Sequence, residues 1–446
     1  MLGGRGCRLA LAALAAGAVA TGTSTAAVAS PASPADSVRD SQAWVLSMLD
    51  VWAAWSVTEG AGVTVAVLDS GVDPDVTDLT GSVTTGPDLT GLRTPPGNPH
   101  WGEHGTWMAS IIAGHGHDGG LDGIIGVAPQ AKILSIRVIP DKDDPGYRTY
   151  DTEPEAAIQQ SLATGIRDAV RDGAKVISMS IGYSAPSGAV RAALQYAYSH
   201  GAVLVASSGN SGQDDQRRDH GFAPVSFPAE YPGVLSVGAV DRSGAAAGFS
   251  SNNLSVQVAA PGVGVPAQGR DGLYWTVDGT SPACALVAGV AALIESRYPR
   301  IPPAAVLQAL TSTARNSPPG GYNVRTGFGI VDAAAALRAA GRLLAARPAP
   351  SQVASSAHFG GGAAAVPAPP VPTRGAGRLV LFAVLAVVSL GLALAGGAGL
   401  AAARRGRSAP GYPAGPGYGP GYGPGYGPGF GGPVGGSGYG VPDDRA

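Results

Sequence analysis

The serine at position 281 has surroundings in which a hydroxyl could do chemistry. It lies in the stretch VDGTSPACALVAG (residues 277–289), before a run of small and apolar residues that is typical of a buried helix. Ser often caps a helix start, and Pro282 fits the first helical position, where its missing N–H costs nothing. Ser281 is therefore either a capping residue or a nucleophile held at a helix start, and other parts of the chain must decide.

A serine hydroxyl becomes a good nucleophile only when an imidazole takes its proton and a buried carboxylate orients that imidazole. His104 is the strongest candidate base, because among the seven histidines it alone lies between turn glycines at a predicted helix start. Asp69 is the strongest candidate carboxylate, because it ends an apolar run that is typical of a buried strand. The amide of Asn210 and the backbone N–H of Ser281 could donate to the oxyanion.

The pattern of strands and helices predicts how these residues come together. Stretches of helical periodicity separate several short apolar runs, which are typical of buried strands and occur at residues 63–71, 132–139, 174–182 and 203–210. This alternation predicts an α/β fold of three layers, a mostly parallel sheet between helices. Such sheets bind ligands beyond the carboxyl ends of their strands. We therefore expect one rim of the fold to carry the residues at those ends, Asp69, Ser180, Gly182 and Asn210.

Six segments resemble, in this order, the signature blocks of subtilisin-family serine proteases: AVLDSGVD, HGTWMASIIAG, GVAPQAKILSIRV, VISMSIG, VASSGN and GTSPACALVAG. The order Asp, His, Ser along the chain is also that of subtilisin. The resemblance covers roughly residues 44–340 and implies a subtilisin-like fold with serine endopeptidase activity. It implies that Asp69, His104 and Ser281 form the catalytic triad and that Asn210 holds the oxyanion.

The same resemblance implies two substrate-binding segments. The first, Ser180, Ile181 and Gly182, would pair with the substrate backbone as an added strand. The second would line the pocket for the residue before the scissile bond and consists of Ser207, Ser208 and Gly209.

The loop at residues 114–123, GHGHDGGLDG, raises the question of a metal. It precedes GVAP, where subtilisins often carry a calcium loop, and its candidate ligands are His115, His117, Asp118 and Asp122. His is an unusual calcium ligand, no zinc-type spacing occurs, and the glycines favour a flexible surface loop. We predict no metal and no cofactor, with calcium as the alternative.

The remaining segments predict an exported and anchored chain. Arg5, Arg8 and the apolar run after them are typical of a signal peptide, and residues 379–403 carry no charge and are long enough to cross a bilayer. The predicted order is a signal peptide (1–29), an N-terminal extension (30–62), a peptidase domain (63–344), an Ala/Pro-rich linker (345–377), a transmembrane helix (378–403) and a Gly/Tyr/Pro-rich cytoplasmic tail (404–446).

This layout resembles that of the mycosins of actinobacterial type VII secretion. The resemblance implies a single-pass protein of the cell membrane, with its catalytic domain outside the cytoplasm and its C-terminus inside. It implies protein or peptide substrates, and the type VII secretion machinery and the cytoplasmic membrane as partners. The alternative function is a structural component of a secretion complex whose proteolytic activity is dispensable.

Charge and cysteine content narrow the remaining possibilities. The formal net charge is −2, so the chain lacks the excess positive charge that is typical of nucleic-acid-binding proteins, and we expect no nucleic-acid partner. The acidic segment at residues 140–155 is either a solvated loop or the source of a preference for basic residues upstream of the cut. Cys284 has no partner once Cys7 leaves with the signal peptide, and we expect it to pack as a small apolar group.

Overall fold

The structure is a computed structural model that describes residues 34–120, 122–215 and 222–346. The predicted signal peptide, transmembrane helix and cytoplasmic tail lie outside the described residues, as does nearly all of the predicted linker. Within the described part of the chain, no helix is long and apolar enough to cross a membrane.

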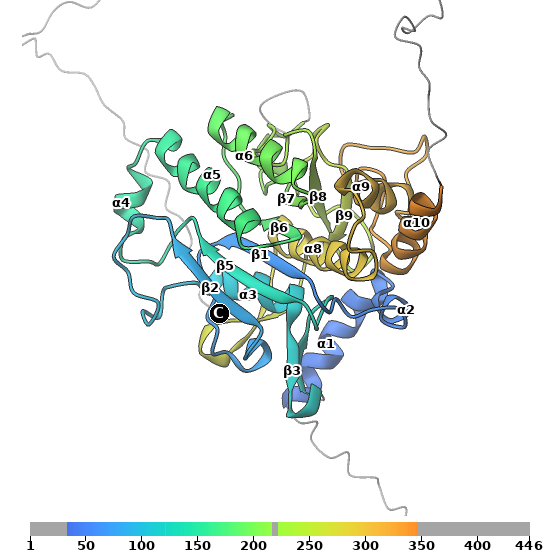
Figure 1. Ribbon diagram of the computed structural model, residues 1–446, viewed down its shortest axis with the longest axis horizontal. Coiled ribbons are helices and arrows are strands. Elements are labelled where there is room, and N and C mark those ends of the chain that lie inside the picture. The colour runs from blue at the N-terminus through green and yellow to red at the C-terminus, as the bar shows by residue number, and fades with distance from the viewer. Residues whose placement is uncertain (1–33, 121, 216–221, 347–446) are drawn as a thin grey trace, which may run out of the picture. The chain divides into compact units, whose positions relative to one another are not determined.

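A seven-stranded sheet forms the middle layer (Figure 1). Its strands lie in the order β2 (Val83–Asp88), β5 (Lys132–Arg137), β1 (Thr64–Asp69), β6 (Val176–Met179), β7 (Val203–Ser207), β8 (Val234–Val240) and β9 (Val258–Pro261). All neighbouring strands are parallel, so their carboxyl ends share one edge. The chain builds the sheet from β1 to one side and then, from β6 onward, to the other. The strand order reverses between β1 and β6, so a ligand is expected to bind beyond the carboxyl ends of these two strands.

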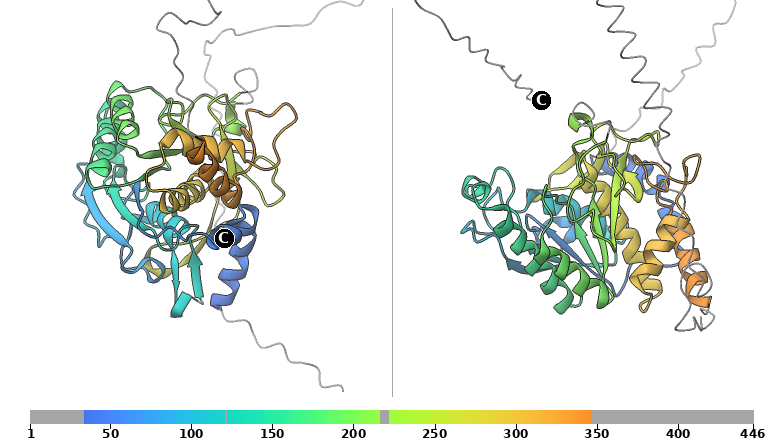
Figure 2. Two further views of the ribbon diagram at one scale, coloured as in Figure 1. Left: turned by 45° about the vertical axis from the view of Figure 1, so that its right-hand side comes forward. Right: turned by 90° about the horizontal axis from the view of Figure 1, so that it is seen from above.

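Helices cover both faces of this sheet (Figure 2). One face packs on α5 (Glu155–Arg171) and α6 (Gly188–Ser199), and the other on α3 (Glu103–Ala113) and α8 (Thr280–Arg297). Along β1, Val65 and Val67 belong to the core under α8, whereas Ala66 and Leu68 belong to the core under α5, because successive side chains point to opposite faces. The predicted three-layer α/β fold with a mostly parallel sheet is confirmed.

The described part of the N-terminal extension packs into the core. It forms α1 (Pro34–Met48) and α2 (Val51–Trp55), and Val45, Leu46 and Leu49 are buried in the same cluster as α8. Two further helices, α9 (Pro303–Ser312) and α10 (Ala333–Ala345), lie in this layer. Hydrophobic burial therefore holds residues 34–62 to the domain that follows them.

Short elements complete the described chain. Two hairpins are formed by β3 (His115–His117) with β4 (Asp122–Ile125), and by β10 (Val265–Gln268) with β11 (Tyr274–Val277). Single turns of helix occur at α4 (Tyr147–Asp151), α7 (Gly212–Asp215), η1 (Thr77–Leu79), η2 (Asp118–Gly120) and η3 (Arg270–Gly272).

Three strands end earlier than the sequence predicts. The runs expected to reach residues 139, 182 and 210 leave the sheet after Arg137, Met179 and Ser207. The next residue can still make a bond to the neighbouring strand; for example, the N–H of Val138 bonds the carbonyl oxygen of Asp69 in β1 (2.9 Å). Ser180, Gly182 and Asn210 therefore lie in rim loops, whereas Asp69 is the last residue of β1, as predicted.

Candidate active site

Asp69 and His104 form a direct contact at the rim of the sheet. Asp69 is the last residue of β1 and is fully buried, and His104 is the second residue of α3. The Oδ1 atom of Asp69 accepts hydrogen bonds from the backbone N–H of Ser70 (2.7 Å) and from Nδ1 of His104 (2.7 Å). Because Nδ1 carries the proton in this contact, Nε2 of the neutral imidazole is left as an acceptor, which is the tautomer a general base needs.

The charges around His104 raise the pKa of its imidazole. Burial by itself would lower that pKa, but the charge of Asp69, the hydrogen bond from Asp69 and the charge of Asp141 outweigh it. The pKa of His104 therefore lies above its usual value of 6.5. The raised pKa means that His104 is neutral only at a higher pH than an ordinary histidine. In this neutral form it is a stronger base and accepts a proton readily.

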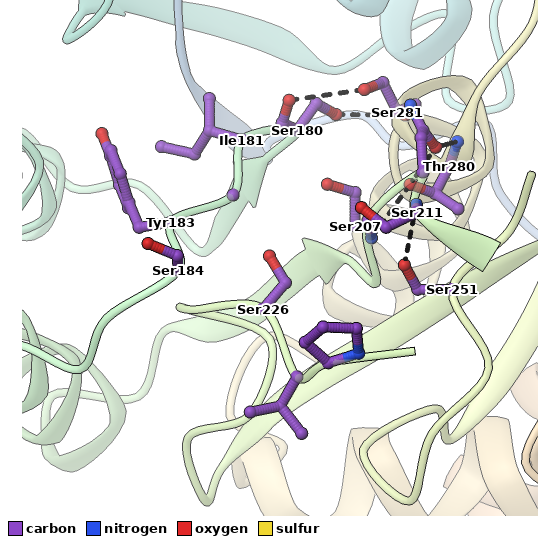
Figure 3. Close-up of a pocket in the computed structure, with 15 residues that line it drawn as sticks. Ser180, Ile181, Tyr183, Ser184, Ser207, Ser211, Ser226, Ser251, Thr280 and Ser281 are labelled. Atoms are coloured by element: carbon purple, nitrogen blue, oxygen red, sulfur yellow. Dashed lines mark hydrogen bonds between the residues drawn. The ribbon is translucent and has the colours of Figure 1, made fainter. Parts of the chain in front are cut away.

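Ser281 lies at the start of the buried helix α8. The helix begins at Thr280, two residues before the predicted first position at Pro282, and its N-cap is Gly279. The hydroxyl of Ser281 donates to the carbonyl oxygen of Ser180 (3.4 Å), and the hydroxyl of Ser180 donates to the carbonyl oxygen of Ser281 (3.0 Å; Figure 3). Among the described residues it makes no hydrogen bond with His104, so the side chain must rotate before it can reach the imidazole. Such contacts are often loose without substrate.

Asn210 provides the cap that α8 lacks. Its Oδ1 atom accepts the backbone N–H of Thr280 (2.9 Å) and the Thr280 hydroxyl (2.9 Å). These two donors fix the orientation of the amide, so the Nδ2 group points away from them. A Cβ atom at Gly279 would lie 3.4 Å from Nδ2, an ordinary contact distance, so the amide lies next to the N-cap of α8. The arrangement leaves two donors at this helix start, the Nδ2 amide of Asn210 and the backbone N–H of Ser281.

A hollow of about 380 Å³ opens beside Ser281 (Figure 3). Five of the six predicted substrate-binding residues line it: Ser180, Ile181, Gly182, Ser207 and Gly209. Ser208 does not, because its side chain is fully buried and its N–H bonds the carbonyl oxygen of Val237 (3.0 Å). The other described residues that line it are also uncharged: Tyr183, Ser184, Asn210, Ser211, Pro224, Val225, Ser226, Ser251, Thr280 and Ser281.

A second hollow, of about 540 Å³, lies on the other side of the segment 180–182. Ser180 and Gly182 line both hollows, and His104 lines the second one together with Trp107 and Ile139. Among the described residues, the backbones of Ile181 and Gly182 make no backbone–backbone hydrogen bonds. An extended peptide could therefore pair with this segment and place side chains alternately in the two hollows.

The loop at residues 114–123, for which the sequence predicts no metal, brings some of its candidate ligands together. Ligand atoms of His117, Asp118 and Asp122 lie within 4.8 Å of one another, and Nδ1 of His117 bonds buried Asp78 (2.7 Å). His115 is not part of this group. The guanidinium of Arg39 already bonds the carbonyl oxygens of residues 120, 122 and 123, so a cation entering here would meet positive charge.

The thiol of Cys284 is buried under the site. It lies on α8 and contacts the hydroxyl of Ser178 (3.8 Å). Burial raises the pKa of the thiol to about 11, so it stays protonated and unreactive near neutral pH. The expected packing role of Cys284 is consistent with this position.

Several residues at the site were not predicted from the sequence. Thr280, Ser226 and Ser251 line the hollow beside Ser281, and Asp141 contacts the start of α3. Thr280 could have been found from its place beside Ser281. Asp141 belongs to the acidic segment 140–155, which the sequence analysis considered for its charge and not as a cap of α3. Ser226 and Ser251 come from distant segments with no chemical motif.

Comparisons with known proteins agree with this geometry. The sequence profile of the Subtilase family matches residues 60–329. Mycosin-1 of Mycobacterium tuberculosis is 34% identical over 347 residues, 69% of this chain and 76% of that protein. Subtilisin DY of Bacillus licheniformis is 34% identical over 258 residues, 58% of this chain and 85% of that protein. The solved structure of MycP1, described as a serine protease and an essential component of the type VII (ESX-1) secretion system, superposes with a TM-score of 0.54. It is 34% identical, and the match covers 66% of this chain and 88% of that one.

Proposed function

We propose, because the chain belongs to the subtilase family of serine endopeptidases, that Ser281 is its nucleophile, His104 its general base and Asp69 the carboxylate that orients the base. The observation that carries the assignment is the 2.7 Å contact between Asp69 and His104, at the rim where Ser281 opens α8. Asp69 is the only one of the three that is buried, which suits a group that never leaves its partner.

The proposed reaction begins when the Ser281 hydroxyl turns from the carbonyl of Ser180 to Nε2 of His104. His104 takes the hydroxyl proton as Oγ attacks the scissile carbonyl, and Asp69 stabilises the imidazolium. The oxyanion is held by the backbone N–H of Ser281 and by the Nδ2 group of Asn210. His104 then donates its proton to the leaving amine, and a water molecule, activated by the same imidazole, hydrolyses the acyl-enzyme at Ser281.

The substrate is proposed to bind as an extended peptide along residues 180–182. The free backbone groups of Ile181 and Gly182 supply the pairing, and the hollow of about 380 Å³ receives the side chain before the scissile bond. Because the described residues that line that hollow are all uncharged, we propose a preference for uncharged residues at this position. A buried charge without a partner would be costly there.

The proposed setting is the outer side of the cell membrane. The predicted signal peptide (1–29) and transmembrane helix (378–403) support an anchored protein with an extracytoplasmic catalytic domain, and the likeness to Mycosin-1 supports processing of secreted proteins in a type VII system. The second candidate is a structural component whose proteolysis is dispensable. It is favoured by the description of MycP1 as an essential component of such a system.

A Ser281→Ala variant of the full chain tests the function and separates the two candidates. The purified variant should lose all hydrolysis of a peptide library while keeping the unfolding temperature of the wild type. Retained hydrolysis would refute the triad. A strain that carries the variant and still secretes normally would support the structural candidate, and a strain that fails to secrete would exclude it.

A further inference from the structure

The start of α3, which carries His104, cannot cap itself. The first backbone N–H groups of a helix have no partner within the helix, and a side chain at the N-cap usually accepts one of them. The N-cap of α3 is Gly102, which has no side chain. A Cβ atom there would lie 3.0 Å from the carbonyl carbon of Gly71, and one at Gly105 would lie 2.0 Å from the carbonyl oxygen of Gly71. The helix start therefore packs directly on the chain after β1, where only glycine fits.

Asp141 supplies the missing cap from the loop that follows β5. Its Oδ2 atom accepts the backbone N–H of Glu103 (2.8 Å), and its Oδ1 atom accepts that of His104 (3.2 Å). The next N–H, that of Gly105, donates to the hydroxyl of Ser70 (3.1 Å). The backbone that positions His104 is therefore held by the carboxylate of Asp141 and by the hydroxyl of Ser70, the residue after Asp69.

Asp141 is also one of the charges that act on the imidazole. Asp69 of β1 and Asp141 are the charges that raise the pKa of His104, and Lys142 and Asp143 line the same hollow as His104. Glu103, beside it on α3, directs its carboxylate to the N–H of Arg270 (3.1 Å), and α8 offers the uncharged Ser281. Burial, followed by the charge of Asp69, raises the pKa of Asp141 itself.

We propose that Asp141 is a positioning residue for the base: its carboxylate fixes the start of α3 and, as an anion, stabilises the imidazolium of His104 together with Asp69. The inference rests on the proposed role of His104 as general base. Asp141 acts through the helix and through its charge, and it transfers no proton in this account.

The test measures His104 directly, so it does not depend on hydrolysis. In the full chain carrying Ser281→Ala, NMR of ¹⁵N-labelled histidine follows the imidazole titration, with His104→Gln to assign the signal. Asp141→Asn keeps one acceptor but removes the charge, and it should lower the pKa of His104 by about 0.5 to 1 pH unit. Asp151→Asn is the matched control, because Asp151 is exposed at the end of α4, after the same loop, and lines neither hollow of the site. It should leave the titration within about 0.2 unit, since water and salt screen an exposed charge.

The same substitutions are then measured with Ser281 intact. Asp141→Asn should lower kcat/KM about tenfold, mainly through kcat, and Asp141→Ala about a hundredfold, because small misplacements of a catalytic group are costly. If Asp141→Ala fails to fold, Asp141→Asn alone tests whether Asp141 positions His104. The proposal is overturned if Asp141→Asn matches Asp151→Asn in titration and in kcat/KM, even where it lowers the unfolding temperature. If the wild type hydrolyses nothing, the proposed function fails, whereas the NMR titration still decides the role of Asp141.

Discussion

Glu295 lies where a carboxylate is unfavourable, and this gives a quantitative prediction for stability. It sits near the C-terminal end of α8, is 2% exposed, and its Oε1 atom has no hydrogen-bond partner in the described structure. Burial raises the pKa of Glu295 to about 7, and the charge of Lys175 opposes this only in part. The carboxyl group is therefore stable in its neutral form and costly as an anion.

The sign and size of the effect follow from proton linkage. The folded chain binds this proton more tightly than the unfolded chain, in which the pKa is the usual 4.5. The free energy of unfolding therefore falls as pH rises from about 4.5 to about 7, and the loss is complete above that range. At 1.36 kcal/mol per pKa unit the loss is about 3 kcal/mol at pH 8.

Glu295→Gln should remove this loss, because the amide stays neutral at every pH. Measured by urea unfolding in the Ser281→Ala background, which prevents self-digestion, the variant should gain up to about 3 kcal/mol at pH 8 and less than about 1 kcal/mol at pH 5. Glu153→Gln, an exposed control, should change stability by less than about 0.5 kcal/mol at both pH values. Equal gains at both pH values, or a loss at pH 8, would refute the reasoning.

Three further predictions concern the site. Asn210→Ala should lower kcat on the order of 100- to 1000-fold with little change in KM, measured by steady-state kinetics. A large rise in KM with kcat unchanged would argue against an oxyanion role. The kcat/KM of the wild type should fall on the acid side with an apparent pKa above 6.5, because His104 must be neutral to act as a base; an acid limb near pH 4 would contradict this. In a peptide library analysed by mass spectrometry, cleavage after uncharged residues should exceed cleavage after Lys, Arg, Asp or Glu by at least about tenfold, and equal rates would remove the specificity proposal.

The sequence predicts the layers of the fold well, because they depend on local patterns. The unbroken apolar run Val65, Ala66, Val67 and Leu68 predicts a strand that is buried on both faces. In the structure, Val65 and Val67 lie in one core cluster and Ala66 and Leu68 in the other. Where a strand stops is harder to predict, because pairing depends on the neighbouring strand. Ser208 illustrates this. Its place in the motif predicts a residue that lines the substrate pocket, but its N–H bonds the carbonyl oxygen of Val237 in β8 and its side chain is buried.

Contacts between distant segments were beyond the sequence. Asp141 caps α3 because Gly102 and Gly105 press against Gly71, and no local pattern encodes that packing. The N-terminal extension is a similar case. The sequence analysis separates residues 30–62 from the peptidase domain, yet Leu46 and Leu49 complete the core beside α8.

The most direct test of the account is covalent labelling of the purified full chain with a fluorophosphonate probe, followed by peptide mass spectrometry to locate the adduct. The account predicts a single adduct on Ser281 that is lost in His104→Ala and Asp69→Ala, because only an activated hydroxyl reacts. An adduct on another serine, or undiminished labelling of Ser281 without His104, would contradict it.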